Sequence, residues 1–304
     1  MMSDFSISVV IPTKNRATIL LNNIQSILFQ TIKPDQLVIV DQSDNDLSKI
    51  KILKLLQDSD IDLTYIHDKE ILGLVDAKRE GVLHCKYNII FFLDDDAFLE
   101  EDYFLEMLRG FKTQSDMIAS CAVVTNYPYT SNAIKLFYNI FHRGIFKGDR
   151  IGVYGKYSGN GHQLVQSNSL SGGCSAWKKE VFDNVRFDVV NKFHMCEDID
   201  FSTRVAKHYG NRLYINPNAR LKDCRDEVVR EDFGGMQRQR MKEYLVYYKK
   251  RKNWKETRLF DLLLFLLGRF FESSVRCLSE KSIKPIFGYF LGIKEGIAFK
   301  IYYD

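Results

Sequence analysis

The sequence predicts the α/β fold class, with a three-layer and mostly parallel sheet, from two observations. Short runs of Val, Ile, Leu and Phe alternate with segments whose apolar residues recur at helical spacing, at about 20 to 30 residues per unit. Carboxylates directly follow two of the runs, at Asp41 and at residues 94–96. Right-handed crossovers place the carboxyl ends of parallel strands along one edge of the sheet, where ligands bind. We therefore expect these acids to share one ligand-binding edge.

Short uninterrupted apolar runs predict the buried strands, because a strand covered on both faces needs no polar alternation. The first run, ISVVI, is expected to stop at Pro12. The predicted strands span residues 7–11, 36–40, 63–67, 88–93 and 117–124.

The segments between these strands predict helices. After Asn15 and Arg16, apolar residues stand at positions 19, 20, 24, 27 and 28, which form one face of a helix. Further helices are predicted over residues 47–56 and 73–84, and another is expected to begin near Glu100.

The segment 88–101, NIIFFLDDDAFLEE, carries the clearest signal of a site. Asp94, Asp95 and Asp96 follow a buried strand at once, and desolvating even one carboxylate without a partner costs several kcal/mol. A divalent cation at the end of the strand would explain the cluster, because hard cations take carboxylate oxygens. A solvated acidic turn that caps the next helix is the alternative.

Composition excludes several protein classes. The 304 residues are 45% hydrophobic and 27% charged, as in a soluble globular protein with one large core or a catalytic domain plus an appendage. Six cysteines without a CxxC pair argue against a zinc site or a disulfide scaffold and suit a reducing compartment. The first residues lack the basic flank and apolar core of a signal peptide, so a cytoplasmic location is expected.

Charge is distributed unevenly along the chain. From Arg220 onward, 19 Lys and Arg stand against 12 Asp and Glu, whereas the preceding 219 residues hold 24 against 27. A mildly acidic first part is thus followed by a basic tail, which predicts an anionic surface as partner.

Four segments in order resemble one enzyme family. VVIPTKNR, VDQSD, GLVDAKREGV and FFLDDDA resemble, in sequence and spacing, the family-2 glycosyltransferases of the Rossmann-like GT-A fold. The resemblance covers roughly the first 220 residues. It implies transfer of a sugar from a nucleoside-diphosphate sugar to an acceptor hydroxyl, with inversion at the anomeric carbon and with Mn²⁺ or Mg²⁺ as cofactor.

The resemblance also assigns residues to the nucleotide. Pro12 and Thr13 would line the base and ribose, Asp41 would accept a hydrogen bond from the base, and Asn15 and Arg16 would lie beside the nucleotide sugar. Asp41 could instead cap a loop, and Arg16 could merely flank the start of a helix.

Nearer the transferred sugar, the resemblance implies a donor contact and a metal site. Lys78, beside Arg79, would lie near the donor, although a solvated helix face is an open alternative. Asp94 to Asp96 look like the DxD motif of the family. Asp96 would be the direct metal ligand, with Asp94 a second candidate ligand, and Asp94 or Asp95 would lie nearer the ribose and sugar.

Gly172 and Gly173, in the segment LSGGCSAWKKEVF, correspond to a Gly-Gly turn followed by a short helix in the family. That turn would form the floor under the transferred sugar, because glycine lets the backbone approach a ligand closely. Ordinary turn glycines are the alternative.

Glu197 and Asp198 open a predicted helix, and with Asp200 they match the EDxD pattern of the family. The helix dipole stabilises negative charge at this end, so a carboxylate here can serve as a base. We assign the base to Asp198, with Glu197 beside it. Acids are also common at helix starts for the dipole reason alone.

The segment NPNARLKDC departs from the family, which often has a His two residues after the Leu. This chain has Asp223 there, and Asp can also bind a hard cation, so Asp223 is a third candidate metal ligand. Earlier in the chain, residues 126–166 interleave aromatic residues with glycines, among them Tyr154 and Tyr157. They predict an acceptor-side loop or, alternatively, a hydrophobic cluster around a helix at 134–141.

The tail predicts helices that lie on a membrane. Residues 236–258 form a basic helix, and in residues 259–278 the charged side chains fall near one stripe. The longest uncharged run there, 262–268, is far shorter than the roughly 20 residues that span a bilayer, so an interfacial helix is predicted. Residues 283–303 repeat this character. Packing onto the catalytic domain or onto a second subunit, as a homo-oligomer, is the alternative.

We therefore expect a GT-A domain at 1–225, with a nucleotide-sugar half (1–125) and an acceptor half (126–225), followed by an α-helical appendage at 226–304. The expected activity uses a UDP-, dTDP- or GDP-sugar and a saccharide or lipid-linked saccharide acceptor, for cell-surface polysaccharide or lipid-linked glycan synthesis at the inner membrane face. A metal-dependent nucleotidyltransferase or a non-catalytic glycan-binding protein are the alternatives. Nucleic acid is not expected as a partner, because no module that reads it accompanies the basic run.

Overall fold

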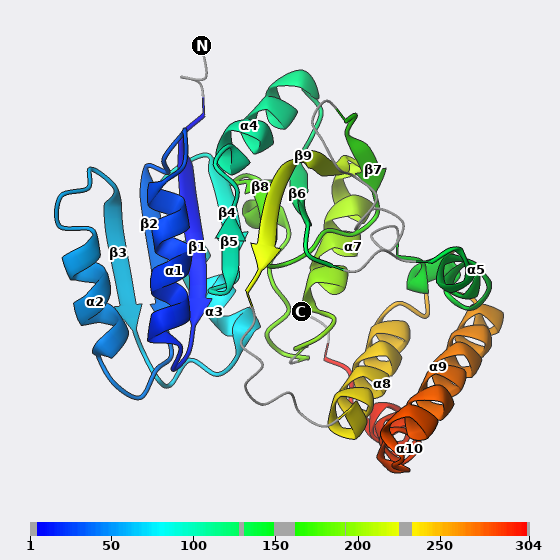
Figure 1. The fold of residues 1–304 in the computed structure, drawn as a ribbon. Helices are drawn as coiled ribbons and strands as arrows, with labels where there is room; N and C mark the ends of the chain where they lie inside the picture. The colour runs from blue at the N-terminus through cyan, green and yellow to red at the C-terminus, as the bar shows by residue number, and fades with distance from the viewer. Residues whose placement is uncertain (1–4, 128–130, 149–161, 192, 225–232, 303–304) are drawn as a thin grey trace.

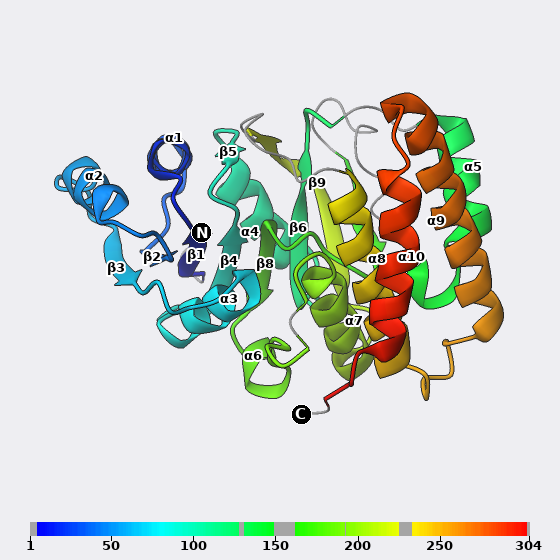
Figure 2. The same cartoon turned by 90° about the horizontal axis from the view of Figure 1, so that it is seen from below.

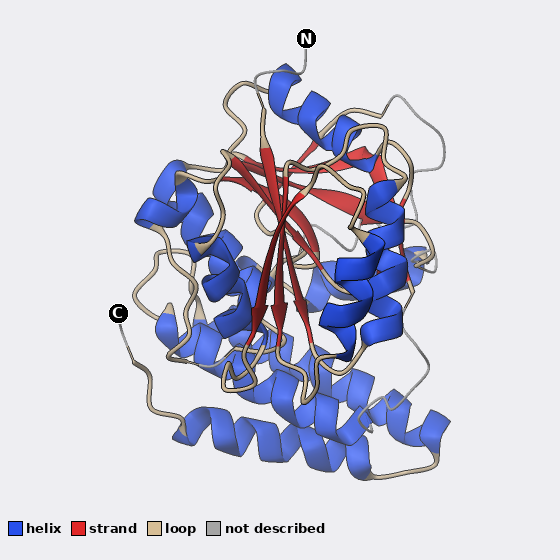
Figure 3. Cartoon of the chain, turned by 90° about the vertical axis from the view of Figure 1, so that its left-hand side faces the viewer, coloured by secondary structure: helices blue, strands red, loops and turns tan. Residues whose placement is uncertain are grey.

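The computed structural model describes residues 5–127, 131–148, 162–191, 193–224 and 233–302. A single mixed sheet lies at its centre with helices on both faces, and the C-terminal helices gather at one end of the molecule (Figures 1 and 3). The order of the described strands is β3-β2-β1-β4-β8-β6-β9-β5, with β7 also paired to β9. The α/β class and its helical C-terminal part are confirmed. Tyr154, Tyr157 and the expected domain boundary near residue 225 lie outside the described residues.

The first four strands are parallel, as predicted: β1 (Ile7–Thr13), β2 (Gln36–Asp41), β3 (Asp62–His67) and β4 (Ile89–Leu93). Their crossovers contain α1 (Ala17–Leu28), α2 (Leu47–Leu55) and α3 (Leu74–Leu83). Pro12 lies inside β1 and does not end it. The pairing of β1 with β4 stops at Val10, so no amide hydrogen is needed from Pro12 on that side.

The rest of the sheet is mixed, so the prediction of parallel strands holds only for its first part. β6 (Ala119–Val124) runs parallel to β9 (Leu213–Asp223). The strands β8 (Cys174–Lys178), β5 (Ala97–Leu99) and β7 (Val165–Ser167) pair antiparallel with their neighbours. Since β8 separates β4 from β6, an antiparallel strand lies in the middle of the sheet.

Two local predictions were wrong. The acidic turn is followed by the strand β5, and the helix expected near Glu100 is α4 (Tyr103–Thr113), which begins after that strand. The strand was not predicted, because three residues are too few to show a strand period. The Gly-Gly turn leads into the strand β8 and not into a helix; the short helix α6 (Val181–Asn184) comes after that strand.

The C-terminal helices form a second apolar core. It joins the 3₁₀ helix η1 (Gly144–Phe146), α8 (Phe233–Lys250), α9 (Leu259–Glu280) and α10 (Lys284–Ala298), and α5 (Asn132–Phe141) packs against α9 beside it. Figure 2 shows α8 and α10 side by side. A Cβ at Gly292 of α10 would lie 2.2 Å from the carbonyl oxygen of Arg238, so glycine is what lets these helices approach so closely. Within the described residues, no helix combines the length and the apolarity needed to cross a membrane.

Candidate active site

The ends of β1 and β4 bring the acidic cluster against a hydroxyl and a guanidinium group. The Oδ2 atom of Asp95 accepts a hydrogen bond from Thr13 Oγ1 at 2.7 Å, and its Oδ1 pairs with Arg16 Nη1 at 2.5 Å. The other guanidinium nitrogen of Arg16 lies 3.0 Å from Asp96 Oδ2. Arg16 therefore bridges two of the three carboxylates, which partly offsets their mutual repulsion.

Asp95 is the most deeply buried of the three acids, at 4% exposure. Burial raises its pKa to about 7, although Arg16 and Thr13 act in the opposite direction. Both of its carboxylate oxygens are already engaged by side chains from β1 and the following loop. Asp95 thus fixes the loop through both of its oxygens.

A buried asparagine, which was not predicted from the sequence, stabilises the acidic loop by hydrogen bonds to its backbone. Asn23, on α1, donates through Nδ2 to the carbonyl oxygens of Asp94 at 3.2 Å and Ala97 at 2.6 Å. The available signal was a polar residue within the apolar face of a helix; its exposure is 1%. Such a residue satisfies backbone groups in a turn that would otherwise be buried without partners.

The ends of β1 and β2 form the neighbouring part of the same edge. Asp41 is fully buried, and it accepts hydrogen bonds from the Tyr65 hydroxyl and from the backbone N–H of Ser43. Burial, followed by these contacts with Asp41, raises the pKa of the Tyr65 hydroxyl. Asn15 has a positive φ of 55° and donates its backbone N–H to Ser43 Oγ at 2.7 Å, which ties the two loops together. Pro12 pairs with Val40 in the adjoining strands.

Lys78 does not lie on a solvated face. It is 2% exposed, and its Nζ lies 3.0 Å from Glu197 Oε1, which is also buried. Burial lowers the pKa of Lys78, but the carboxylates of Glu197, Asp94 and Asp198 outweigh it and leave the pKa raised. Arg79, the next residue, is exposed and pairs with Asp76 on its own helix.

Glu197 is held in this pair and cannot readily accept another proton donor. Burial raises its pKa, Lys78 opposes the rise, and the adjacent Asp198 adds to it. Asp198 is only half-buried, in the first turn of α7 (Glu197–Tyr209). Its Oδ1 accepts the backbone N–H of Ile199 at 2.7 Å. Of the two acids, Asp198 is the more exposed.

Gly172 and Gly173 connect the acidic loop of β4 with the start of α7. A Cβ at Gly173 would lie 2.0 Å from Asp94 Oδ2, and one at Gly172 would lie 2.6 Å from Lys78 Nζ. The backbone N–H of Asp94 donates to the carbonyl oxygen of Gly173 at 3.0 Å, and that of Gly172 donates to Asp198 Oδ2 at 3.4 Å. A side chain at either position would displace these groups, so the two glycines let the acids of β4 and of α7 lie close together.

The helix α8 fixes the loop that leads into α7. Glu243, 3% exposed, accepts the backbone N–H groups of His194, Met195 and Cys196 at 2.8–3.1 Å. This carboxylate satisfies donors directly before the helix that carries Asp198. A glutamate some 50 residues away in sequence leaves no local pattern, so the sequence analysis did not identify it.

Asp200, the third acid of the EDxD pattern, is buried and engaged with cations of the C-terminal part of the chain. It is 1% exposed and pairs with Arg204 on α7 and with Lys250 and Arg251 of the α8 region. Burial favours its neutral form, but these three cations hold its pKa well below the usual range. Asp200 therefore anchors α7 to the C-terminal part of the chain.

Asp223 lies at the end of β9, opposite Ala97 of β5. Its Oδ2 accepts a hydrogen bond from the Tyr127 hydroxyl at 2.9 Å, and the N–H of the following Cys224 donates to the carbonyl oxygen of Asp96 at 2.8 Å. The antiparallel pairing thus brings Asp223 to the acidic loop.

The donor set suits a cation held jointly by protein and substrate. Among the described residues, Asp94, Asp95, Asp96, Glu197 and Asp198 bring five carboxylates to the junction, against the two cations Lys78 and Arg16. No three His, Cys, Asp or Glu side chains in the described ranges form a ready-made cage. Mg²⁺ is commonly held by one or two carboxylates together with substrate phosphates. The site fits a divalent ion of that kind.

The sequence profile described as "Glycosyl transferase family 2" matches residues 8–186, more than half of the chain and every element that carries this junction except α7. The chain belongs to glycosyl transferase family 2. The family resemblance seen in the four sequence segments is thereby confirmed. The C-terminal helices lie outside the matched range.

Two curated glycosyltransferases are similar over part of the chain. Glycosyltransferase GlyA of Streptococcus pneumoniae serotype 4 is 27% identical over 197 residues, covering 62% of this chain and 27% of GlyA. The uncharacterized glycosyltransferase RC0461 of Rickettsia conorii is 29% identical over 148 residues, covering 49% of this chain and 23% of that protein. The chain thus spans about a quarter of the length of these relatives.

Solved structures show the same fold. The mannosyltransferase PcManGT from Pyrobaculum calidifontis, in complex with GDP-Man and Mn²⁺, superposes with a TM-score of 0.58 at 16% identity, covering 97% of this chain and 73% of PcManGT. GalNAc-T7, with UDP, GalNAc and Mn²⁺, gives a TM-score of 0.58 at 13% identity, covering 80% of this chain and 50% of that one. These likenesses establish the GT-A fold.

Proposed function

We propose that this glycosyltransferase moves a sugar from a nucleoside-diphosphate sugar to an acceptor hydroxyl, with inversion at the anomeric carbon. One observation carries the proposal: the acidic loop of β4 and Asp198 of α7 meet across Gly172 and Gly173. The carboxylates that would hold the cation and the candidate base thus lie on either side of one Gly-Gly turn. A direct displacement needs its base and its leaving-group stabiliser on opposite sides of the sugar.

On the donor side, the ends of β1 and β2 would hold the nucleotide. Pro12, Thr13 and Asn15 would line the base and ribose, and Asp41 would accept from the base. Arg16 would turn toward the diphosphate, since its guanidinium group already lies at the acidic loop. The GDP-Man and UDP found with the two solved relatives support a nucleotide at this edge.

Asp96 and Asp94 would hold Mn²⁺ or Mg²⁺, with Asp223 as a further ligand from β9. When bound, the ion would supply positive charge to the departing diphosphate. Lys78 adds a fixed positive charge beside Asp94 and Glu197, and Asp95 keeps the loop in place through Thr13 and Arg16.

Asp198 would take the proton of the acceptor hydroxyl. Its half-exposed carboxylate lies in the first turn of α7, whereas Glu197 is engaged with Lys78. A positioned general base contributes roughly 10²- to 10⁴-fold in rate. Glu197 would orient the start of α7 and the lysine, and would not exchange protons with the acceptor.

Peripheral association with a membrane is part of this proposal. The helix α9 buries the charged side chains of Asp261 and Arg269 and exposes a stripe of apolar ones (Leu263, Leu267, Phe271, Val275 and Leu278). A helix that buries two of its charged side chains and exposes a stripe of apolar ones needs an apolar surface to cover that stripe. We infer that this surface is the bilayer interface, which a lipid-linked acceptor would share.

Thermal unfolding with nucleotides tests the catalytic proposal. UDP, GDP and dTDP are added one at a time, each with and without Mn²⁺, to the full chain and to Asp96→Asn. One nucleotide is expected to raise the unfolding temperature only with Mn²⁺; at 100 times its Kd it adds about 2.7 kcal/mol of stability. The variant should lose the Mn²⁺-dependent part. No shift with any of the three nucleotides would contradict the proposal.

A further inference from the structure

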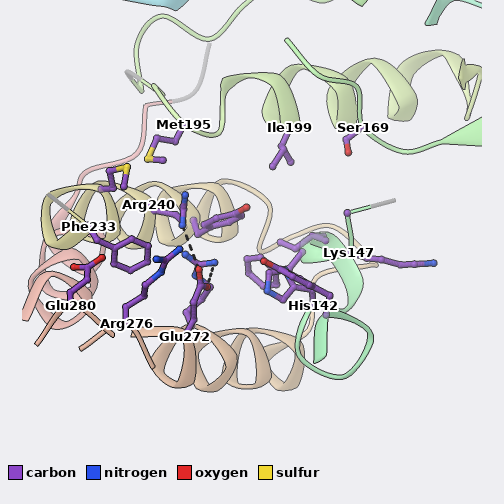
Figure 4. Close-up of a pocket in the computed structure, with 17 residues that line it drawn as sticks. His142, Lys147, Ser169, Met195, Ile199, Phe233, Arg240, Glu272, Arg276 and Glu280 are labelled. Atoms are coloured by element: carbon purple, nitrogen blue, oxygen red, sulfur yellow. Dashed lines mark ion pairs between the residues drawn. The ribbon is translucent and has the colours of Figure 1, made fainter. Parts of the chain in front are cut away.

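A cavity of about 800 Å³ lies between the C-terminal helices and the start of α7. Its walls come from α5, η1, α8 and α9, and on the other side from Ser169, Met195 and Ile199 (Figure 4). Met195 and Ile199 flank Glu197 and Asp198 in sequence. The volume is within the range of ordinary ligand sites, about 300–1,000 Å³. This cavity therefore borders the first turn of α7, which carries the candidate base.

The cavity carries a surplus of positive charge. Among its described lining residues, four side chains are cationic and two are carboxylates, which leaves two positive charges in excess; they are Lys147, Arg240, Arg269, Arg276, Glu272 and Glu280. Glu272 is shared by two guanidinium groups: Arg269 pairs with it closely, and Arg240 Nη1 lies 3.9 Å from its other oxygen. One carboxylate cannot neutralise both.

Arg269 makes this surplus costly. It is 4% exposed, and besides Glu272 its guanidinium donates to Gln237 Oε1 at 2.7 Å. Its buried Nε has no hydrogen-bond partner among the described residues, and neither has the buried Nε2 of the neighbouring His142. Burial lowers the pKa of Arg269, and Glu272 opposes this only in part. An anion in the cavity would supply the missing compensation.

The remaining walls suit a sugar. Tyr138, Phe146, Phe233 and Tyr244 line the cavity. Aromatic faces pack well against the apolar faces of sugar rings, while the guanidinium groups of Arg240 and Arg276 can each form two parallel hydrogen bonds with a phosphate. Along α9, the cavity residues Glu272 and Arg276 directly follow the exposed Phe271 and Val275. The charged cavity and the apolar stripe are adjacent faces of one helix.

We propose that this cavity binds the phosphate group of a phosphate-bearing saccharide, which serves as the acceptor. The inference rests on the proposed transferase function and names its substrate class. Two surplus positive charges match a phosphate monoester or a diphosphate diester better than the single charge of a sugar acid. The sugar would extend from the phosphate past Met195 and Ile199 toward Asp198.

Calorimetric titration of the full chain tests this site with four probes: glucose 1-phosphate, glucose, glucuronic acid and a decyl-diphosphate-linked N-acetylglucosamine. We expect the two phosphate probes to bind and the two others to bind at least tenfold more weakly. Arg240→Gln and Arg276→Gln should each raise the Kd of the phosphate probes about tenfold, about 1.4 kcal/mol. Arg238→Gln is the matched control. Arg238 lies on α8, as Arg240 does, but it pairs with Glu295 of α10 and does not line the cavity.

The possible results of the titration distinguish a phosphate site from its alternatives. Absence of binding by both phosphate probes, equal binding of glucuronic acid, or equal loss in Arg238→Gln would overturn the proposal. Tenfold tighter binding of the lipid-linked probe would identify a lipid-linked acceptor, and equal binding a soluble sugar phosphate. The Mn²⁺-dependent rise of the unfolding temperature with UDP, GDP or dTDP is measured separately on the unaltered chain. Its absence would count against the proposed transferase function, whereas the titration alone decides the phosphate site.

Discussion

At the scale of single residues, the candidate site depends on a buried ion pair. Lys78 and Glu197 come from α3 and α7, lie 3.0 Å apart and are 2% and 8% exposed. Removing one partner of such a pair leaves a buried charge without compensation, which costs about 3–5 kcal/mol, while removing both is far less costly. The ion pair therefore holds α3 and α7 against each other beside the acidic loop.

Lys78→Met is expected to lower the free energy of unfolding by about 3–5 kcal/mol, because Glu197 is left buried and unpaired. The double variant Lys78→Met with Glu197→Leu should recover most of that loss in chemical denaturation. Arg79→Met is the control, since Arg79 is exposed and pairs only within its helix. If the single and double variants were equally destabilised, the pair would not be the source of the loss.

His142 gives the molecule a specific acid sensitivity. Burial, and then Arg269, lowers its pKa from 6.5 to about 3, so the folded chain keeps this side chain neutral. Below pH 6.5 the unfolded chain binds a proton that the folded chain does not, and stability falls as the pH falls. Between pH 6.5 and about 5.5 the loss amounts to about 1 kcal/mol.

His142→Gln should remove that dependence. Denaturation measured at several pH values is expected to give a shallower loss of stability on acidification than in the unaltered chain, by about 1 kcal/mol over that interval. His84→Gln is the control, because His84 is exposed near Glu80. Parallel pH profiles for the unaltered chain and His142→Gln would contradict the assignment.

At the scale of elements, α8 is the link between the catalytic fold and the C-terminal helices. It contacts α7 at two places: Glu243 accepts the three N–H groups before it, and Arg251, directly after α8, pairs with Asp200 within it. The helix lies outside the matched family range, yet it positions the segment that carries Asp198.

Glu243→Gln is therefore expected to lower kcat for sugar transfer about tenfold, because an amide has one carbonyl oxygen and weaker hydrogen bonds for three N–H donors. The KM for the nucleotide sugar should change little, since the donor side is built on other strands. Gln239→Ala is the comparison, because it removes the side-chain hydrogen bond that Gln239 donates to Glu243 and leaves the three backbone N–H groups with their acceptor. A changed donor KM with an unchanged kcat would argue against this positioning role.

At the scale of the whole molecule, the sequence predicted what is encoded within single elements. Apolar runs, together with the polar residues that directly follow or precede them, predicted three features: the parallel first half of the sheet, the acids after β4 and the start of α7 at Glu197. Contacts between distant segments were not predictable, because the pairing of Glu243 or Arg251 with α7 leaves no spacing pattern. The periodicity of α9 showed a charged stripe but not that two of its members, Asp261 and Arg269, are buried inside the protein.

The exposed apolar stripe of α9 predicts that the protein binds to lipid vesicles. Co-sedimentation with vesicles of anionic and zwitterionic lipids should show binding that increases with the anionic fraction, because the chain beyond residue 220 is basic. Leu267→Glu with Phe271→Glu is expected to abolish it, whereas Leu53→Glu, at an exposed position on α2, should not. If the α9 variant instead kept vesicle binding but lost self-association, the stripe would be a contact between two copies.

The central claim is that Asp198 is the base facing a cation-binding loop, and Asp198→Asn tests it most directly. Donor binding in the presence of Mn²⁺ and the rate of sugar transfer are measured on the same preparation. We expect a donor Kd within about threefold of that of the unaltered chain and a transfer rate lower by at least about 10²-fold. Undiminished transfer by Asp198→Asn would contradict it.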